Sequence, residues 1–327
     1  MPERVNEGER LRRVYLGIDG GQSSTTALIA GEDGAVLGKG TGGPCNHVSS
    51  AEAREKFSRA IRACVERACA AAGLEYFTVV FEATCLGFSG GAKDKDAYSR
   101  ELIRSRRFKI THDAEIALAG ATAGEPGIII IGGTGSMAFG RNADGRTARA
   151  GGWGYVFGDE GGGFDLTRRA LRAALRFEEG WGPPTSLHAF LLDATGAPDM
   201  NDLMHQFYTP KFTRVEIAAM AEMVSRAAGY GDAVALEILR TAAADLCSYV
   251  EGVYRQLFST GERAAIAYIG GVFNSSPLLG EFIKLIADRL GSHAERPRLS
   301  PAAGALLEAL RAGGNSSTLS NVPESEK

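Results

Sequence analysis

The chain has 327 residues, enough for two domains that each bury a core. Its apolar content of 44% and charged content of 23% are ordinary for a soluble globular protein. The net charge of -3 argues against nucleic acid as the main partner, because binding a phosphate backbone needs a concentrated positive surface. No apolar run is long enough to cross a bilayer and residues 1–12 do not resemble a signal peptide, so we expect a cytoplasmic protein without a membrane partner.

The cysteines are scattered and odd in number, which excludes a disulfide framework and a CxxC ligand pair. They are Cys45, Cys64, Cys69, Cys85 and Cys247. We expect reduced thiols that serve mainly in packing.

A first hairpin is predicted over residues 14–40. Its parts are the strand VYLGID, a glycine pair, a Ser/Thr cluster, the strand ALIA and an Asp33-Gly34 turn. Glycine lets backbone amides approach a ligand closely, and amides and hydroxyls gathered in a turn form a natural anion site. The candidate phosphate contacts of this loop are Gly20, Gly21, Ser23, Ser24 and Thr25.

The segment between residues 50 and 121 alternates strands and helices. In chain order, the pattern predicts a helix over 51–72 capped by Ser50, a strand over 77–81, a helix over 94–104, a strand over 108–111 and a short helix over 114–121. Strands followed by helices indicate an α/β domain.

A second hairpin repeats the plan of the first. It contains the strand IIII, a glycine pair, the run TGS, a short apolar run and an Asp144-Gly145 turn. Gly20 and Gly132 are 112 residues apart. This repeat predicts two similar α/β domains with mixed sheets that grip a polyphosphate in an interdomain cleft. The phosphate contacts expected from this loop are Gly133, Thr134, Gly135 and Ser136.

The rest of the chain is mostly helical. A glycine-rich loop, GGWGYVFGDEGGGF, begins at Gly151 and fits a backbone that lies close to a small polar ligand. Helices are expected over 164–177, 186–193, 213–227, 233–257, 278–290 and 301–311, with a strand over 264–269 before Gly270-Gly271. The polar tail, 313–327, is expected to be disordered, as are residues 1–12.

Two aspartates follow strands and are candidates for catalysis. Asp19 can hold a hydrated Mg²⁺ against nucleotide phosphates, or it can simply cap the turn that follows. Asp113 can act as the general base that accepts a proton from an attacking hydroxyl, or it can be a helix N-cap.

Other polar and glycine positions suit a sugar and an adenine. Asn46 follows a Gly/Pro loop and offers a donor and an acceptor for sugar hydroxyls or an acetamido group. Trp153 can pack against a sugar face or be a buried aromatic residue. Gly270-Gly271 would let an adenine lie against the backbone.

Together these segments resemble the N-acetylglucosamine kinases of the BadF/BadG/BcrA/BcrD-type ATPase family, within the actin/hexokinase/heat-shock-70 fold. The segments are IDGGQSSTTALI, GPCNH, SGG, THDA, GGTGS, GGWGYVFGDEGG and YIGGVF. The resemblance implies ATP-dependent, Mg²⁺-assisted phosphorylation of an amino sugar at its 6-hydroxyl, in a homodimer of actin-like (ribonuclease H-like) domains.

Carried over position by position, the resemblance assigns roles to residues of this sequence. It implies that Asp113 is the catalytic base. It implies sugar contacts at Asn46, Ser89, Gly152, Trp153 and Asp159. The family pattern is also matched by the first and second phosphate loops and by the adenosine motif at Gly270 and Gly271. Gln22-Ser23-Ser24-Thr25 departs from the family pattern, so the hydroxyl donor stays open among its last three residues.

The resemblance also implies that the last helix returns to the N-terminal domain. We therefore expect one domain over 13–115 plus 300–312 and the other over 116–299. Two alternatives belong to the same fold: an ATPase activator of a CoA-ester dehydratase or reductase, and a non-catalytic sugar sensor. N-acetylglucosamine, glucosamine, N-acetylmuramic acid and N-acetylmannosamine all stay open as the acceptor.

Overall fold

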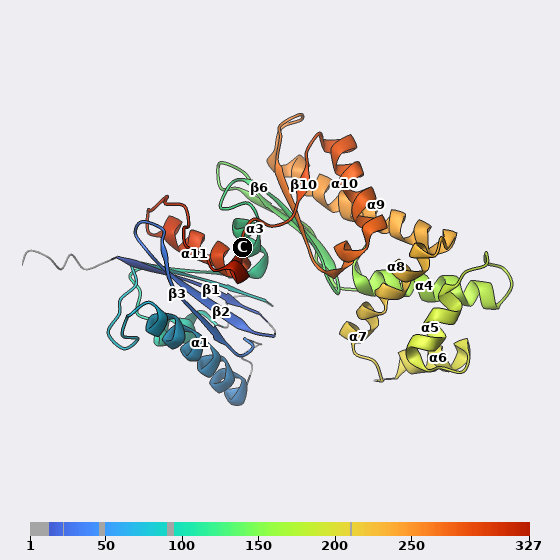
Figure 1. The fold of residues 1–327 in the computed structure, drawn as a ribbon, viewed down its shortest axis with the longest axis horizontal. Coiled ribbons are helices and arrows are strands. Elements are labelled where there is room, and N and C mark those ends of the chain that lie inside the picture. Colours follow the sequence, from blue (N-terminus) through green and yellow to red (C-terminus); the bar gives the residue numbers. More distant parts are fainter. Residues whose placement is uncertain (1–12, 22, 46–49, 90–94, 210) are drawn as a thin grey trace, which may run out of the picture. The chain divides into compact units, whose positions relative to one another are not determined.

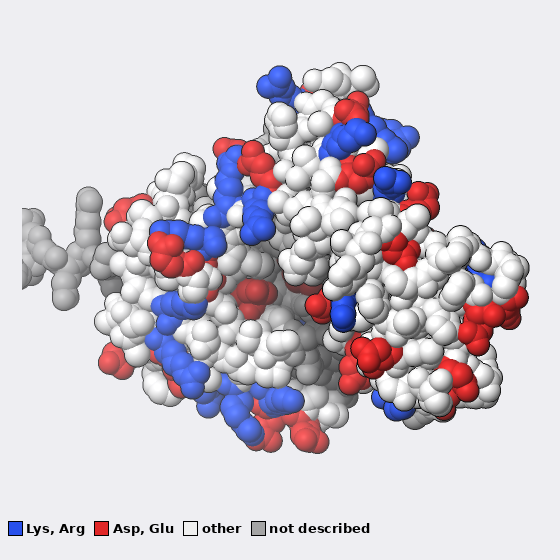
Figure 2. Space-filling model, turned by 45° about the vertical axis from the view of Figure 1, so that its right-hand side comes forward, with Lys and Arg blue, Asp and Glu red and all other residues white. Residues whose placement is uncertain are grey.

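The computed structural model describes residues 13–21, 23–45, 50–89, 95–209 and 211–327. The chain forms two compact units (Figure 1). Unit 1 comprises Met1–Glu125 with Pro297–Lys327, and unit 2 comprises Pro126–Arg296. Among the described residues, no helix combines the length and the apolar character that a membrane span requires. Basic and acidic side chains are interspersed over the face shown in Figure 2.

The sheet of unit 1 has five strands in the order β3-β2-β1-β4-β5. They are β1 (Val14–Gly20), β2 (Thr25–Gly31), β3 (Val36–Gly42), β4 (Ala83–Phe88) and β5 (Phe108–His112). The first three form antiparallel pairs, whereas β4 and β5 run parallel to β1. The sheet is therefore mixed, and the predicted first hairpin is confirmed.

Helices cover both faces of this sheet (Figure 1). Helix α1 (Ala51–Ala71) begins at the predicted cap, Ser50, and buries its apolar side against one face. Helices α3 (Asp113–Ala121) and α11 (Pro301–Ala312) pack on the other face. The contact is close, because a Cβ at Gly17 of β1 would lie 2.2 Å from the backbone nitrogen of Leu306. The last helix thus returns to unit 1, which also contains α2 (Asp96–Leu102).

The C-terminal tail is ordered against unit 1, which differs from the expected disorder. The amide of Val36 donates to Ser320 at 2.9 Å, and the amide of Ser320 donates to Gly34 at 3.0 Å. Near the end, in the short helix η2 (Glu324–Glu326), the carboxylate of Glu326 is buried and pairs with Lys39 at 2.5 Å. A polar composition does not reveal such backbone pairings. They satisfy backbone N–H and C=O groups at a strand edge that would otherwise be unpaired.

Unit 2 repeats the sheet of unit 1. Its order, β10-β9-β6-β7-β8, is the same arrangement of an antiparallel hairpin triplet with two parallel strands. The strands are β6 (Gly127–Gly132), β7 (Ser136–Arg141), β8 (Thr147–Gly151), β9 (Ala265–Ile269) and β10 (Ala294–Glu295). The predicted duplication is confirmed.

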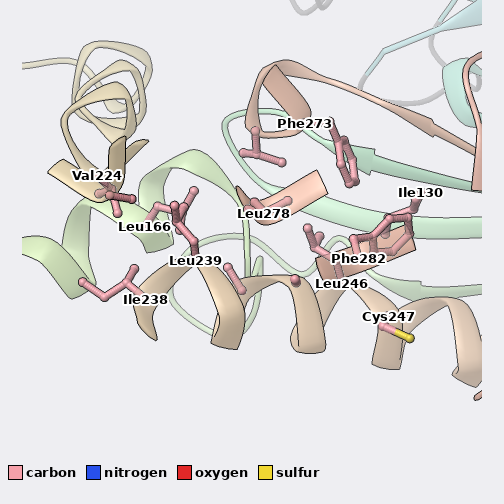
Figure 3. Close-up of a cluster of buried hydrophobic side chains, with 14 of the residues drawn as sticks. Ile130, Leu166, Val224, Ile238, Leu239, Leu246, Cys247, Phe273, Leu278 and Phe282 are labelled. Carbon is pink, nitrogen blue, oxygen red and sulfur yellow. The ribbon is translucent and has the colours of Figure 1, made fainter. Parts of the chain in front are cut away.

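The helices of unit 2 enclose its apolar core. They are α4 (Gly163–Glu178), α5 (Leu187–Thr195), α6 (Met200–Tyr208), α7 (Arg214–Ala219), α8 (Ala221–Gly229), α9 (Ala233–Leu257), η1 (Gly271–Asn274) and α10 (Ser276–Leu290). Figure 3 shows Leu239 and Leu246 of α9 beside Leu278 and Phe282 of α10. The helix expected over 213–227 is divided at Met220 into α7 and α8, and α6 was not expected.

One predicted strand is wrong. Residues 77–81 form a turn and an isolated bridge, and β4 begins only at Ala83. The side chains of Phe77 and Val80 are exposed. All of 83–88 is buried between β1 and β5, so sheet pairing rather than local apolar content decides where the strand lies.

Candidate active site

Three neighbouring strands of unit 1 end at the same edge of the sheet. Gly20 of β1 is in register with Phe88 of β4, and Phe88 is in register with His112 of β5. Because these strands are parallel, the residues at their carboxyl ends are brought together. The edge therefore gathers Asp19, Ser89 and Asp113, which are far apart in the sequence.

Asp113 is held by two hydrogen bonds. It is the first residue of α3, where a carboxylate is favoured by the helix dipole. Its Oδ1 accepts a hydrogen bond from the amide of Ala114 at 2.9 Å, and its Oδ2 accepts one from the hydroxyl of Ser89 at 2.8 Å. The side chain is half-buried. Ser89, expected to contact sugar, is thus placed as an orienting partner of Asp113.

Asp19 lies in an environment that disfavours its charge. Burial, and then the nearby charges of Asp113 and Glu326, raise the pKa of Asp19 to about 6. At neutral pH, repulsion between the carboxylates of Asp19 and Asp113 raises the free energy of the folded protein. A cation bound at this edge would remove that cost, which fits the expected role of Asp19.

The first glycine loop is tightly built. The amide of Gly21 donates to the carbonyl of Ser24 at 3.0 Å, which closes the turn. Ser23 and Ser24 are exposed, so their hydroxyls can reach a ligand. Thr25 cannot, because it is fully buried and its hydroxyl donates to the carbonyl of Gly43 at 2.7 Å. The expectation that Thr25 could contact phosphate is therefore corrected.

The expected sugar contact Asn46 lies outside the described residues.

The second glycine loop joins β6 to β7 in unit 2. The amide of Gly133 donates to the carbonyl of Gly135 at 2.9 Å, and a Cβ built on Gly133 would have no neighbour within 4 Å. The hydroxyl of Ser136 is already used, because it donates to the carbonyl of Glu160 at 2.6 Å. Of the two predicted hydroxyl donors in this loop, only Thr134 is left for a ligand.

The glycine-rich loop after β8 is fastened to this phosphate loop. The amide of Gly152 donates to the carbonyl of Ser136 at 2.9 Å. Asp159 is buried and its carboxylate packs so closely on Gly135 that a Cβ there would lie 2.2 Å from Oδ2. Its backbone has φ of +64°, a conformation that is strained for a residue other than glycine. Such strain is found at functional sites.

Trp153 is on the surface, so the alternative interpretation, that it is a buried aromatic residue, is wrong. Its side chain is 66% exposed, and the guanidinium of Arg149 lies over its ring at 4.7 Å.

The predicted adenosine motif meets the phosphate loop. Gly270 has φ of +110°, and a Cβ there would lie 2.1 Å from the carbonyl oxygen of Gly132. Only glycine permits this approach. Gly271 follows with nothing within 4 Å of its Cβ position.

These two motifs open into one cavity of about 830 Å³ within unit 2. Gly133, Thr134 and Gly271 line one side. The other side is formed by α7 and α8, which were not recognised as site elements from the sequence. Their lining residues include Val215, Ala218, Ala219, Glu222, Ser225 and Arg226. Apolar walls with a few polar groups beside a phosphate loop can hold a nucleoside.

The thiols form no metal or cluster site in the described part of the chain. All five cysteines are buried and free. Among the described residues, no three His, Cys, Asp or Glu side chains are grouped to hold a metal ion.

Comparison with known proteins identifies the family of this chain. The family model described as the BadF/BadG/BcrA/BcrD ATPase family matches residues 16–309. An N-acetylmuramic acid/N-acetylglucosamine kinase of Clostridium acetobutylicum is 35% identical over 84% of this chain and 90% of its own length. An N-acetyl-D-glucosamine kinase of Dictyostelium discoideum is 29% identical over 91% of this chain and 98% of its own.

A solved structure has the same fold. It is a Chromobacterium violaceum protein provisionally assigned as an N-acetylglucosamine kinase, with a TM-score of 0.68 and 27% identity. The alignment covers 90% of this chain and 98% of that one. The expected pair of actin-like domains with mixed sheets is confirmed. On the family match over most of its length, this chain belongs to the BadF/BadG/BcrA/BcrD ATPase family.

Proposed function

We propose that this sugar kinase transfers the γ-phosphoryl group of ATP to the 6-hydroxyl of an amino sugar, with Asp113 as the general base. The observation that carries the proposal is the geometry of Asp113 at the carboxyl edge of unit 1. Ser89 and the amide of Ala114 engage both of its oxygens and fix the direction of the carboxylate. An oriented carboxylate beside a phosphate loop is what a hydroxyl acceptor needs in order to lose its proton.

The electrostatics of Asp19 support a bound Mg²⁺. Burial, and then the nearby carboxylates of Asp113 and Glu326, raise the pKa of Asp19 to about 6. We infer that Asp19 holds Mg²⁺ through water, because Mg²⁺ keeps several waters and takes few protein carboxylates. The ion, when bound, neutralises charge on the transferring phosphate.

Unit 2 supplies the nucleotide site in this proposal. Thr134 and the amides of the second glycine loop would hold phosphates, while Gly271 and the apolar wall of α7 would hold the nucleoside. In unit 1 the corresponding phosphate contacts would be the backbone of Gly20 and Gly21 and the hydroxyls of Ser23 or Ser24.

The acceptor would be held by Asn46 and by the loop that contains Gly152, Trp153 and Asp159. The similarity to two kinases of N-acetylated sugars supports an amino sugar as the acceptor. We also propose a cytosolic homodimer that needs neither nucleic acid nor a membrane.

A coupled assay of ADP release tests the proposal. The wild type should release ADP when N-acetylglucosamine, glucosamine, N-acetylmuramic acid or N-acetylmannosamine is added, and little without sugar. Asp113→Asn should lose turnover by about 10²- to 10⁴-fold while still binding ADP. Asp96→Asn is the matched control, because Asp96 also begins a helix but lies on an exposed surface. Turnover retained by Asp113→Asn would contradict the role of Asp113.

A further inference from the structure

A second cavity of unit 2, of about 640 Å³, lies between α4 and α9 and shares no lining residue with the cavity beside the second glycine loop. Small-molecule sites commonly have volumes of about 300 to 1,000 Å³. The lining comes from one side of each helix and from the turn that follows α4. It includes Arg172 and Arg176 of α4, Pro183 and Pro184 of the turn, and Val234 and Ile238 of α9.

The turn that forms one wall of this cavity is fixed at both ends. At α4, the amide of Gly182 donates to the carbonyl of Arg176 at 2.8 Å, and a Cβ on Gly182 would lie 2.6 Å from the Cβ of Arg176. At α9, the carboxylate of Asp232 accepts a hydrogen bond from the amide of Ser186 at 2.6 Å. The two prolines between these anchors have little backbone freedom. The wall is therefore formed before any ligand arrives.

Two guanidinium groups of the lining have no carboxylate partner in the part of the chain that the structure describes. The side chain of Arg172 makes no hydrogen bond or ion pair with any described residue. The guanidinium of Arg176 lies over the ring of Trp181 at 4.9 Å, a contact that leaves its charge unneutralised. One helical turn apart, these two side chains lie on the same side of α4. Positive charge is therefore gathered on one wall of the cavity.

The other charged residues of the lining already have partners. The guanidinium of Arg169 lies 2.7 Å from a carboxylate oxygen of Asp165 and 2.7 Å from one of Asp245. Glu237 of α9 is exposed and has the guanidinium of Arg240 at 4.0 Å. The charge that a ligand meets in this cavity therefore comes mainly from the two unpaired guanidinium groups of α4.

We propose that this cavity binds an organic phosphate monoester with an apolar body. A phosphate monoester carries a charge of about −1.5 to −2 at neutral pH, which the guanidinium groups of Arg172 and Arg176 together balance. Each guanidinium can donate two parallel hydrogen bonds to phosphate oxygens. The two prolines, Val234 and Ile238 offer apolar surface to the body of the ligand, and Ile238 is rooted in the core of unit 2 (Figure 3). The phosphotransfer proposed above does not use this cavity.

A second copy of the chain is a less suitable occupant. Most soluble oligomers pair the same patch of both copies around a two-fold axis. A pairing centred on this cavity would bring Arg172 and Arg176 toward the same residues of the other copy, and like charges that face one another oppose association. An organic phosphate brings the opposite charge.

A methyl NMR titration tests the proposal. The full chain, labelled at isoleucine and valine methyl groups and saturated with ADP and Mg²⁺, is titrated with phenyl phosphate. The methyl signals of Val234 and Ile238 should shift saturably, with a Kd of about 1 mM or tighter. Inorganic phosphate, which lacks the body, and benzyl alcohol, which lacks the charge, should each bind at least about tenfold more weakly. Benzoate, with a single negative charge, should also bind more weakly.

Arg172→Gln is the informative variant, because this side chain has no described partner whose loss would disturb the fold. It should raise the Kd for phenyl phosphate at least about tenfold, whereas Arg172→Lys should keep more of the affinity. Arg255→Gln is the matched control, because Arg255 is an exposed arginine near the other end of α9. It should leave the Kd unchanged.

Four results would overturn the proposal. They are no saturable shift at Val234 and Ile238, a shift that is lost once ADP saturates the protein, a Kd unchanged in Arg172→Gln, and equal binding of phenyl phosphate and either inorganic phosphate or benzoate. Shifts of these methyl signals with protein concentration alone would assign the cavity to a second copy and would also overturn it. None of these readouts depends on phosphotransfer, so the outcome is independent of the proposed function.

Discussion

Asp19→Asn should make the protein more stable while it removes phosphotransfer. Burial, Asp113 and Glu326 raise the pKa of Asp19 from 3.8 to about 6 in the folded protein. Between these two values the folded state keeps a proton that the unfolded chain has released, so stability falls as the pH rises through this window. A shift of about two pKa units corresponds to about 3 kcal/mol. Asparagine has nearly the same shape and no charge, so it should recover up to about this amount above pH 6.

Urea unfolding of nucleotide-free protein in EDTA, followed by circular dichroism from pH 4 to pH 8, measures this effect. The advantage of Asp19→Asn should be largest at pH 7 to 8 and should shrink to well under 1 kcal/mol at pH 4, close to the ordinary pKa of 3.8, where the unfolded chain also holds much of its proton. Asp33→Asn is the control, because Asp33 is exposed in the β2–β3 turn. An Asp19→Asn variant no more stable than the wild type at pH 8, or one equally advantaged at pH 4, would refute the reasoning.

Three further predictions test the rest of the account. Gly270→Ala should destabilise the protein by more than about 2 kcal/mol in urea unfolding, because its Cβ would meet a carbonyl oxygen at 2.1 Å. Gly271→Ala should instead fold normally and weaken ADP binding in calorimetry. Equal effects of the two substitutions on stability would count against the close approach at Gly270. Glu308→Gln should cost about 3 kcal/mol, because this fully buried carboxylate pairs with two cations, and a cost below about 1 kcal/mol would show that the pairs contribute little. Asn46→Ala should raise the KM for sugar much more than that for ATP, and an unchanged sugar KM would exclude the contact.

The parts of the fold that depend on local signals could be predicted from the sequence. Glycine pairs and Asp-Gly turns are local, so both hairpins and their duplication are found where expected. The helix cap at Ser50 is equally local, and its side chain accepts a hydrogen bond from the amide of Ala53. The apolar run at residues 77–81 misled the assignment, because which apolar run pairs with β1 is decided by the sheet.

The parts of the site that depend on tertiary contacts could not be predicted. Thr25 and Ser136 look like phosphate ligands in sequence, but the carbonyls of Gly43 and Glu160 occupy their hydroxyls in the fold. The wall that α7 and α8 contribute to the cavity carries no motif. The hydrogen bond from Ser89 to Asp113 joins the residue after β4 to the first residue of α3, so its role in orienting the base is visible only in three dimensions.

The position of the phosphate on the product tests the central claim most directly. Wild-type protein, ATP, Mg²⁺ and N-acetylglucosamine should give a product in which a phosphorus–proton NMR correlation links the new phosphate to the two protons on carbon 6. The same reaction with Asp113→Asn should give almost none of it. A correlation to the anomeric proton, or ATP hydrolysis to free phosphate with the sugar unchanged, would contradict the account.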